Sequence, residues 1–249
     1  MGFKIKFSEP SVLKEIIEAT LVVVEETNIV VSPEGLFIKA IDGSRAAMIE
    51  LMYPSDSFEE FDCSERVEIG ISFTEAKKIL PRIGVNEVVV LEYSEKTGKL
   101  LLKISGETER EYGLRIMDMG RSEIPSLNVS FPAKITLPAA VFSKYIKDVE
   151  IAGETIIFSV EKGVFQIRSE SEVSHAVIKV NLSGSPISNF ESSSSEKINA
   201  EFPTTWLRNL TKIATSAENV TIALGNRVPL KLEYTLEKGK LVYYLAPVS

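Results

Sequence analysis

The feature that most constrains the fold is an internal duplication. Residues 29–37 (IVVSPEGLF) read as strand, turn and strand, and residues 157–165 (IFSVEKGVF) repeat that pattern about 128 positions later. In both copies a glycine in the turn is followed two places on by a phenylalanine. Residues 33–35 and 161–163 have the composition of tight turns between alternating strands. The sequence therefore predicts two similar halves.

The candidate helices recur with nearly the same spacing. Apolar residues at helical spacing predict a helix over about 11–23 and a partner over about 139–149. A second pair is predicted over about 74–83 and 204–215, where Pro203 stands at a position that a helix start tolerates. Alternating apolar residues predict strands at 66–72, 87–93, 99–105, 173–182, 220–224, 229–234 and 240–245.

This element order predicts an α+β duplication. In each half, two helices would cover one face of an antiparallel sheet. We expect an N-terminal domain over 1–116, an extended connector over 117–131 and a C-terminal domain over 132–249. The connector has no clear period and contains Gly120 and Pro125. A chain of 249 residues is long enough for each half to bury its own core.

The composition limits the chemistry. A net charge of -7 argues against simple nonspecific adhesion to nucleic acid, although a local basic surface remains possible. The single cysteine, Cys63, leaves no internal disulfide and no cysteine-based zinc site. The N-terminal residues lack a basic start followed by an apolar core, and no apolar run approaches membrane-spanning length. We expect a soluble intracellular protein.

The predicted helices carry charge opposite to that of the whole chain. A solvated surface is the simpler explanation for one such helix, but three basic helices at duplicated positions favour a surface for a polyanion. No exposed aromatic residues are interleaved, so we expect contacts to phosphates rather than to bases. The candidate DNA-binding residues are Lys14, Lys77, Lys78, Arg82, Lys144, Lys147, Arg208 and Lys212.

Motifs for catalysis are missing from the sequence. There is no P-loop, dinucleotide fingerprint, GxSxG or HExxH, so we predict no catalytic residue, no metal site and no cofactor. His175 and Cys63 are interpreted as structural or surface residues. Two alternatives stay open: a hydrolase with a carboxylate pair drawn from Asp42, Asp118 or Glu123, and a duplicated α+β protein that binds no DNA.

Four segments carry a resemblance to a known family. Residues 238–248 (KGKLVYYLAPV), with 228–234 (VPLKLEY) just before them, resemble the C-terminus of the proliferating cell nuclear antigen (PCNA) clamps of archaea and eukaryotes. Residues 35–45 (GLFIKAIDGSR) resemble the strand and turn before the family's partner-binding site, and residues 114–118 (LRIMD) resemble the start of its connector. The similarity covers the whole chain and favours an archaeal source.

The resemblance implies a DNA sliding clamp. It would be a processivity factor without catalytic activity that encircles duplex DNA and tethers replication and repair enzymes. Three chains would form a ring of six pseudo-equivalent domains, with the helices lining the hole. Implied partners are double-stranded DNA, a clamp loader, DNA polymerase, flap nuclease and ligase, the enzymes binding through short apolar and aromatic motifs. An archaeal clamp would be cytoplasmic and nucleoid-associated, and a eukaryotic one nuclear.

The resemblance also implies two further sets of residues. The subunit seam would lie at about 108–116 and 174–182, with Tyr112, Leu114, Ala176, Ile178 and Val180 near it. The partner-binding pocket would use Ile41, Arg45, Ala46, Met48, Ile124, Pro125, Pro229, Tyr244, Leu245, Ala246 and Pro247. Arg45 and a short connector depart from the family's pattern. They leave open a subunit of a heterotrimeric or checkpoint-type clamp.

Overall fold

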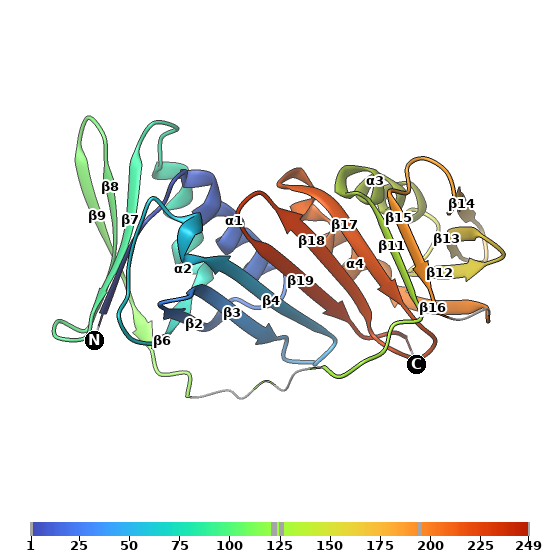
Figure 1. The fold of residues 1–249 in the computed structure, drawn as a ribbon, viewed down its shortest axis with the longest axis horizontal. Helices are drawn as coiled ribbons and strands as arrows, with labels where there is room; N and C mark the ends of the chain where they lie inside the picture. Colours follow the sequence, from blue (N-terminus) through green and yellow to red (C-terminus); the bar gives the residue numbers. More distant parts are fainter. Residues whose placement is uncertain (1, 121–123, 125–126, 194–195, 249) are drawn as a thin grey trace. The chain divides into compact units, whose positions relative to one another are not determined.

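The computed structural model describes the chain except residues 1, 121–123, 125–126, 194–195 and 249 (Figure 1). It divides into two compact units. The first comprises Met1–Ile41 and Ile49–Ile124, and the second comprises Asp42–Met48 and Pro125–Ser249. The short segment Asp42–Met48 thus belongs to the second unit although it lies early in the sequence.

The first half of the chain contains these elements in order: β1 (Gly2–Lys6), α1 (Pro10–Leu21), β2 (Glu26–Ser32), β3 (Gly35–Ile41), β4 (Ala47–Pro54), η1 (Ser55–Ser57), β5 (Glu60–Asp62), β6 (Val67–Ser72), α2 (Phe73–Lys77), η2 (Leu80–Arg82), β7 (Val88–Ser94), β8 (Lys99–Ser105), β9 (Glu109–Leu114) and β10 (Ile116–Met117).

The second half contains β11 (Ala133–Pro138), α3 (Ala139–Val149), β12 (Thr155–Glu161), β13 (Val164–Glu170), β14 (His175–Asn181), β15 (Asn189–Ser192), β16 (Ile198–Pro203), α4 (Thr204–Leu210), η3 (Lys212–Thr215), β17 (Ala217–Leu224), β18 (Leu230–Leu236) and β19 (Lys240–Leu245). The predicted strands 99–105 and 240–245 have these same bounds. The ends of the other predicted strands shift by one to three residues.

The strand order in each half confirms the duplication. One set of neighbouring strands runs β5-β1-β7-β8-β9 in the first half and β15-β11-β17-β18-β19 in the second. The other runs β4-β3-β2-β6 and β14-β13-β12-β16. The α+β class is confirmed, but each half builds two antiparallel sheets where we had expected one. Local alternation predicts a strand but does not specify which distant strand it pairs with.

The predicted turns within the duplication are present. Lys162 and Gly163 connect β12 to β13 with φ values of 50° and 77°, the left-handed backbone that a tight hairpin requires. Gly35, at φ 147°, begins β3, and a Cβ there would come within 2.1 Å of the carbonyl oxygen of Tyr53. Close packing of two backbones therefore also favours glycine at this position.

Two of the four predicted helices are shorter than expected. The third matches its predicted bounds, and the first ends at Leu21. The second ends at Lys77 and is followed by a separate 3₁₀ turn, because Pro81 has no N–H to continue the α-helical pattern. The fourth ends at Leu210. The next residue, Thr211, donates its hydroxyl to the carbonyl of Arg208, which is a local alternative to the helical bond.

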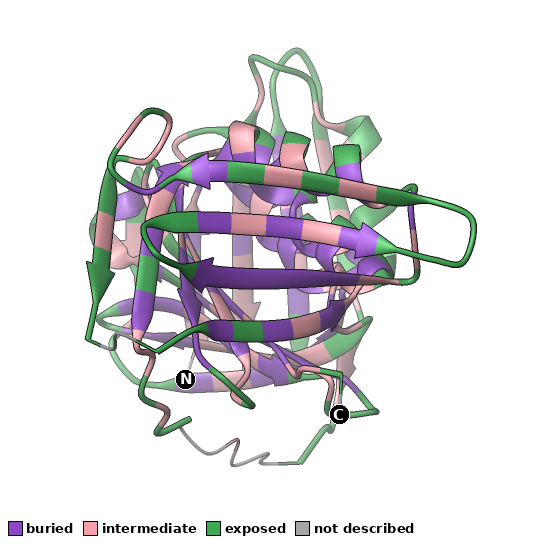
Figure 2. Ribbon diagram, turned by 90° about the vertical axis from the view of Figure 1, so that its right-hand side faces the viewer, coloured by how far each residue is buried: buried purple, intermediate pink, exposed green. Residues whose placement is uncertain are grey.

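Each unit has its own aromatic core. In the second unit the ring of Phe158 lies 5.8–6.1 Å from the rings of Phe142, Phe165 and Phe202, so that α3 and three strands share one cluster. Buried and exposed residues alternate along many of the strands (Figure 2). This alternation places one row of side chains in the core and leaves the other row to solvent.

Candidate functional site

The basic residues singled out on the helices are all exposed. Residues 10–21, 73–82, 139–149 and 204–215 together hold eight basic and four acidic residues, a net charge of +4 in a chain whose total is -7. The helical segments therefore oppose the sign of the rest of the chain. The eight are Lys14 on α1, Lys77, Lys78 and Arg82 on α2 and its following turn, Lys144 and Lys147 on α3, and Arg208 and Lys212 on α4 and its following turn.

The duplication places equivalent cations on α1 and α3. Lys14 precedes the buried Ile16 by two positions, and Lys144 precedes the buried Ile146 in the same way. Because each isoleucine fixes its helix against the core, the lysine two residues earlier must lie on the solvent side. Burial of the apolar stripe therefore positions both cations.

Most of these cations have no carboxylate partner within the chain. Lys78 pairs with Glu75 at 2.6 Å, and the Arg208 Nε lies 4.0 Å from Glu150. Among the described residues, none of the other six has an ion pair within 4.0 Å. Cations that are exposed and largely unpaired can exchange their hydration for contacts with phosphates.

Aromatic rings on the same helices do not form a stacking surface. Phe73 and Phe142 are buried, and Tyr145 and Trp206 are half-buried. Burial also raises the pKa of Tyr145. The described parts of the helices therefore present charge to solvent without an exposed ring on which a base could stack.

A second candidate surface begins at the loop between β3 and β4. The carboxylate of Asp42 accepts the N–H of Ala47 at 2.6 Å, the N–H of Ser44 at 2.9 Å and the Ser44 hydroxyl. Burial raises the pKa of Asp42, but these bonds outweigh it and the net pKa is lowered. They fix the loop, in which the exposed Arg45 adopts a left-handed φ of 59°.

The C-terminal strand joins this loop. Ala246 donates its N–H to the carbonyl of Ala46 at 2.7 Å, and Leu230 lies opposite Leu245 in the β18–β19 register. Val248 donates its N–H to Glu201 at 2.8 Å, which holds the segment beyond β19. Sequence reasoning did not identify these bonds, because no local pattern marks which distant carbonyl an N–H will meet.

The pocket residues named from the sequence differ in accessibility. Met48 and Leu245 are buried, so they can form only the floor of a binding surface. Pro125 lies outside the described residues. Ile41 and Ile124 belong to the first unit and the others that are described to the second. The half-buried members of the second unit are Ala46, Pro229, Tyr244, Ala246 and Pro247.

Two terminal strands match the regions named for subunit contact. β9 ends the order β5-β1-β7-β8-β9, and β14 ends the order β14-β13-β12-β16. Tyr112, Leu114, Ala176 and Ile178 are half-buried, whereas Val180 is buried in its own unit. A terminal strand has backbone N–H and C=O groups available for pairing with another chain.

The comparison with known families decides the identity of this architecture. The model of the proliferating cell nuclear antigen N-terminal domain matches residues 2–123, and that of the C-terminal domain matches residues 123–248. The chain belongs to the PCNA family. The resemblance drawn from the sequence is confirmed, and the chain functions as a DNA sliding clamp.

Named relatives of this PCNA-family chain are archaeal. It is 26% identical over 248 residues to the DNA polymerase sliding clamp of Pyrococcus abyssi, covering 99% of this chain and 98% of the relative. It is 29% identical over 236 residues to the DNA polymerase sliding clamp of Methanococcus vannielii, covering 94% of each. The match therefore extends over nearly the full length of both proteins.

Solved PCNA structures share the fold. PCNA from Thermococcus kodakaraensis superposes with a TM-score of 0.91 at 19% identity, covering 99% of this chain and 100% of that chain. PCNA from Entamoeba histolytica gives a TM-score of 0.90 at 24% identity, covering 99% of both chains. At these identities the structural likeness supports the fold.

The carboxylates considered for hydrolysis serve local structure in this PCNA-family chain. Asp42 holds its loop, and the exposed Asp118 accepts the N–H of Gly120 at 3.0 Å. Glu123 lies outside the described residues. Burial raises the pKa of the Cys63 thiol, which opposes thiolate formation. The described residues contain no acidic, histidine or cysteine group arranged to hold a metal, and no described helix is long and apolar enough to cross a membrane.

Proposed function

We propose that this clamp acts without catalytic activity of its own, as a ring subunit that surrounds duplex DNA. The observation that carries the proposal is the set of eight exposed basic residues on the helices of both units, within an acidic PCNA-family chain. Positive charge on the helices alone suits a surface that faces DNA, while the acidic remainder faces away from it.

Contact with DNA would be blind to sequence. Lysine and arginine side chains on helices reach phosphate oxygens, and phosphates repeat along DNA whatever the bases are. Such contacts are weak and depend strongly on salt, so they allow sliding. Retention would then come from the closed ring rather than from affinity. We assign the contacts to Lys14, Lys77, Lys78, Arg82, Lys144, Lys147, Arg208 and Lys212.

The ring would close through head-to-tail contacts of terminal strands. β9 of one chain would pair with β14 of the next, because two different edges of one chain generate a closed ring when the rotation between neighbours closes. Tyr112 and Leu114 on β9 would meet Ala176 and Ile178 on β14. Val180 would support the seam from within its own unit.

Partner enzymes would bind at the surface formed by the Asp42–Met48 loop and the C-terminal strand. An apolar surface of this kind suits short motifs with apolar and aromatic side chains. The clamp loader, DNA polymerase, flap nuclease and ligase are the partner classes. Met48 and Leu245 would form the floor and Arg45 the rim. The remaining contacts are assigned to Ile41, Ala46, Ile124, Pro125, Pro229, Tyr244, Ala246 and Pro247.

The test of this function compares circular and linear DNA. Labelled clamp is loaded onto a nicked plasmid with an archaeal clamp loader and ATP, separated from free protein, and then treated with a restriction enzyme that cuts once. We expect the clamp to remain on the circle and to leave after the cut, because free ends let a ring slide off. Equal retention on circular and linear DNA would falsify topological binding.

A further inference from the structure

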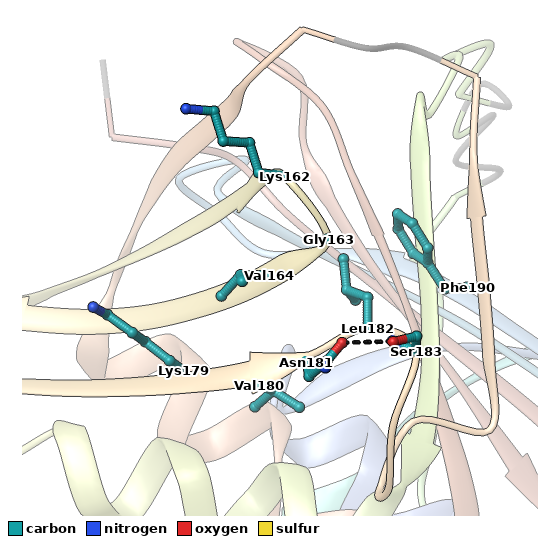
Figure 3. Close-up of a pocket in the computed structure, with 9 residues that line it drawn as sticks. All are labelled: Lys162, Gly163, Val164, Lys179, Val180, Asn181, Leu182, Ser183 and Phe190. Atoms are coloured by element: carbon teal, nitrogen blue, oxygen red, sulfur yellow. Dashed lines mark hydrogen bonds between the residues drawn. The ribbon is translucent and has the colours of Figure 1, made fainter.

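The second unit contains a cavity of about 660 Å³ at one end of the terminal strand β14 (Figure 3). Its lining includes Val164, Leu182 and Phe190 together with Lys162 and Lys179. In Figure 3 both lysine side chains extend away from Phe190. The cavity therefore combines an apolar floor with a basic rim.

Neither lysine of the rim is neutralised by a close ion pair. Lys162 lies 3.9 Å from Glu161 and its side chain is 88% exposed. Lys179 is exposed and has no carboxylate within 4.0 Å among the described residues. Beside them Val164 is 36% exposed, although it lies within a strand. A basic and partly apolar rim of this kind suits an acidic segment of polypeptide.

The first unit has a terminal strand of the opposite charge. The β8–β9 hairpin exposes Glu107 in its turn and Glu109 and Glu111 on β9. Glu111 lies opposite Lys103 on β8, and Lys103 bonds Glu92 at 2.7 Å. Glu109 lies opposite the uncharged Ser105. Glu107 and Glu109 are therefore the acids available to another molecule.

Strand geometry aligns these two edges. If β9 adds to β14 in the antiparallel direction, the start of β9 lies beside the end of β14, where the cavity is. Side chains alternate on both strands, so Glu109 shares the exposed face with Lys179 when Tyr112 shares the opposite face with Ile178. Charge and apolar complementarity are satisfied in the same register.

We propose that the cavity receives the β8–β9 hairpin of a second copy of this chain, with Glu107 and Glu109 against Lys162 and Lys179. Because the chain carries both complementary edges, it closes the ring with itself and needs no different subunit. This inference rests on the proposed ring function and adds the identity of the neighbouring subunit and the contact that selects it.

Charge reversal tests the contact. Native mass is measured by light scattering over a dilution series for the full-length chain, Glu109→Lys, Lys179→Glu and the double variant. The unmodified chain should have a mass of about three times 27.5 kDa. Each single reversal should raise the concentration at which the trimer dissociates about tenfold or more, and the double variant should restore assembly because opposite charges face each other again.

A matched control separates this contact from general charge effects. Glu237→Lys changes an exposed acid in the turn before β19, away from both edges in sequence, and should leave the dissociation concentration unchanged. Circular dichroism of every variant checks that the fold is intact. Single reversals without effect, or a double variant no better than the singles, would overturn the proposed contact.

Failure of this inference can be told apart from failure of the proposed function. A chain that stays monomeric alone, yet is retained on circular DNA when related subunits are added, overturns self-closure and leaves clamp function intact. A self-assembled trimer that shows equal retention on circular and linear DNA overturns the ring function instead.

Discussion

At Asp42 one side chain organises a loop through three hydrogen bonds. Its carboxylate accepts two backbone N–H groups and the Ser44 hydroxyl, and the side chain is buried. Bonds of this kind are stronger when the acceptor is charged. The loop carries Arg45 and Ala46, so the ionised state of Asp42 helps to shape the proposed partner surface.

We expect Asp42→Asn to destabilise the protein at neutral pH by about 1–2 kcal/mol. The pKa of Asp42 is lowered from its ordinary value of 3.8 in the folded chain. A lowered pKa contributes stability that is present above the unfolded value and lost as the pH falls through the folded value. Urea unfolding of both proteins should therefore show a difference at pH 7 that shrinks in acid below the ordinary value.

The exposed Asp56 provides a matched control for that experiment. Asp56→Asn makes the same chemical change outside a buried site, and it should alter the free energy of unfolding by less than about 0.5 kcal/mol. If Asp42→Asn destabilises equally at pH 7 and in strong acid, the charged state of Asp42 does not stabilise the loop.

At the scale of elements, the helices combine structural and functional roles. The apolar stripe of α3, with Phe142, Ile146 and Val149, is buried, and Lys144 and Lys147 are left on the exposed side. The apolar pattern that stabilises the helix therefore also determines the direction of its charge. Substituting the two lysines should change the surface without disturbing the packing.

We expect Lys144→Ala/Lys147→Ala to weaken the salt dependence of DNA binding by the unloaded protein. Each lost phosphate contact should reduce the slope of log K against log salt by about 0.9. Fluorescence anisotropy with a short duplex at several salt concentrations measures this slope. Lys99→Ala/Lys134→Ala removes the same charge from exposed strand positions and should keep the original slope. The assignment to α3 fails if both pairs lower the slope equally.

At the scale of the whole molecule, the charge of -7 limits affinity while the ring supplies retention. An acidic chain gains little from long-range attraction to DNA, and its local cations are screened over roughly 10 Å at 0.1 M salt. Weak contacts that release readily are suited to sliding. This division of roles requires that the ring remain closed.

We therefore expect loaded and unloaded protein to respond differently to salt. Binding of the unloaded chain to a short duplex should fall by more than tenfold as salt rises from about 50 to 200 mM. Clamp already loaded on a closed circle should persist over that range, as measured by gel filtration of the complex. Parallel loss of both forms would mean that electrostatic affinity, and not topology, holds the protein on DNA.

The sequence by itself determined the features that depend on local pattern. The duplicated strand–turn–strand motif, the bounds of α3 and the exposure of all eight helix cations follow from periodicity and turn composition. These are properties of residues a few positions apart, since burial of each apolar stripe fixes where the intervening polar residues point. The family resemblance, carried by short motifs, was also readable from the sequence.

Only the tertiary structure decided which distant segments meet. It divided the strands of each half between two sheets, placed β9 and β14 at sheet ends, and joined Ala46 to Ala246. It also assembled Lys162 and Lys179 around one cavity. Strand pairing and cavity formation depend on contacts between residues far apart in sequence, where many alternative partners share the same alternating pattern. Local periodicity fixes the face of each strand, and long-range packing selects its neighbour.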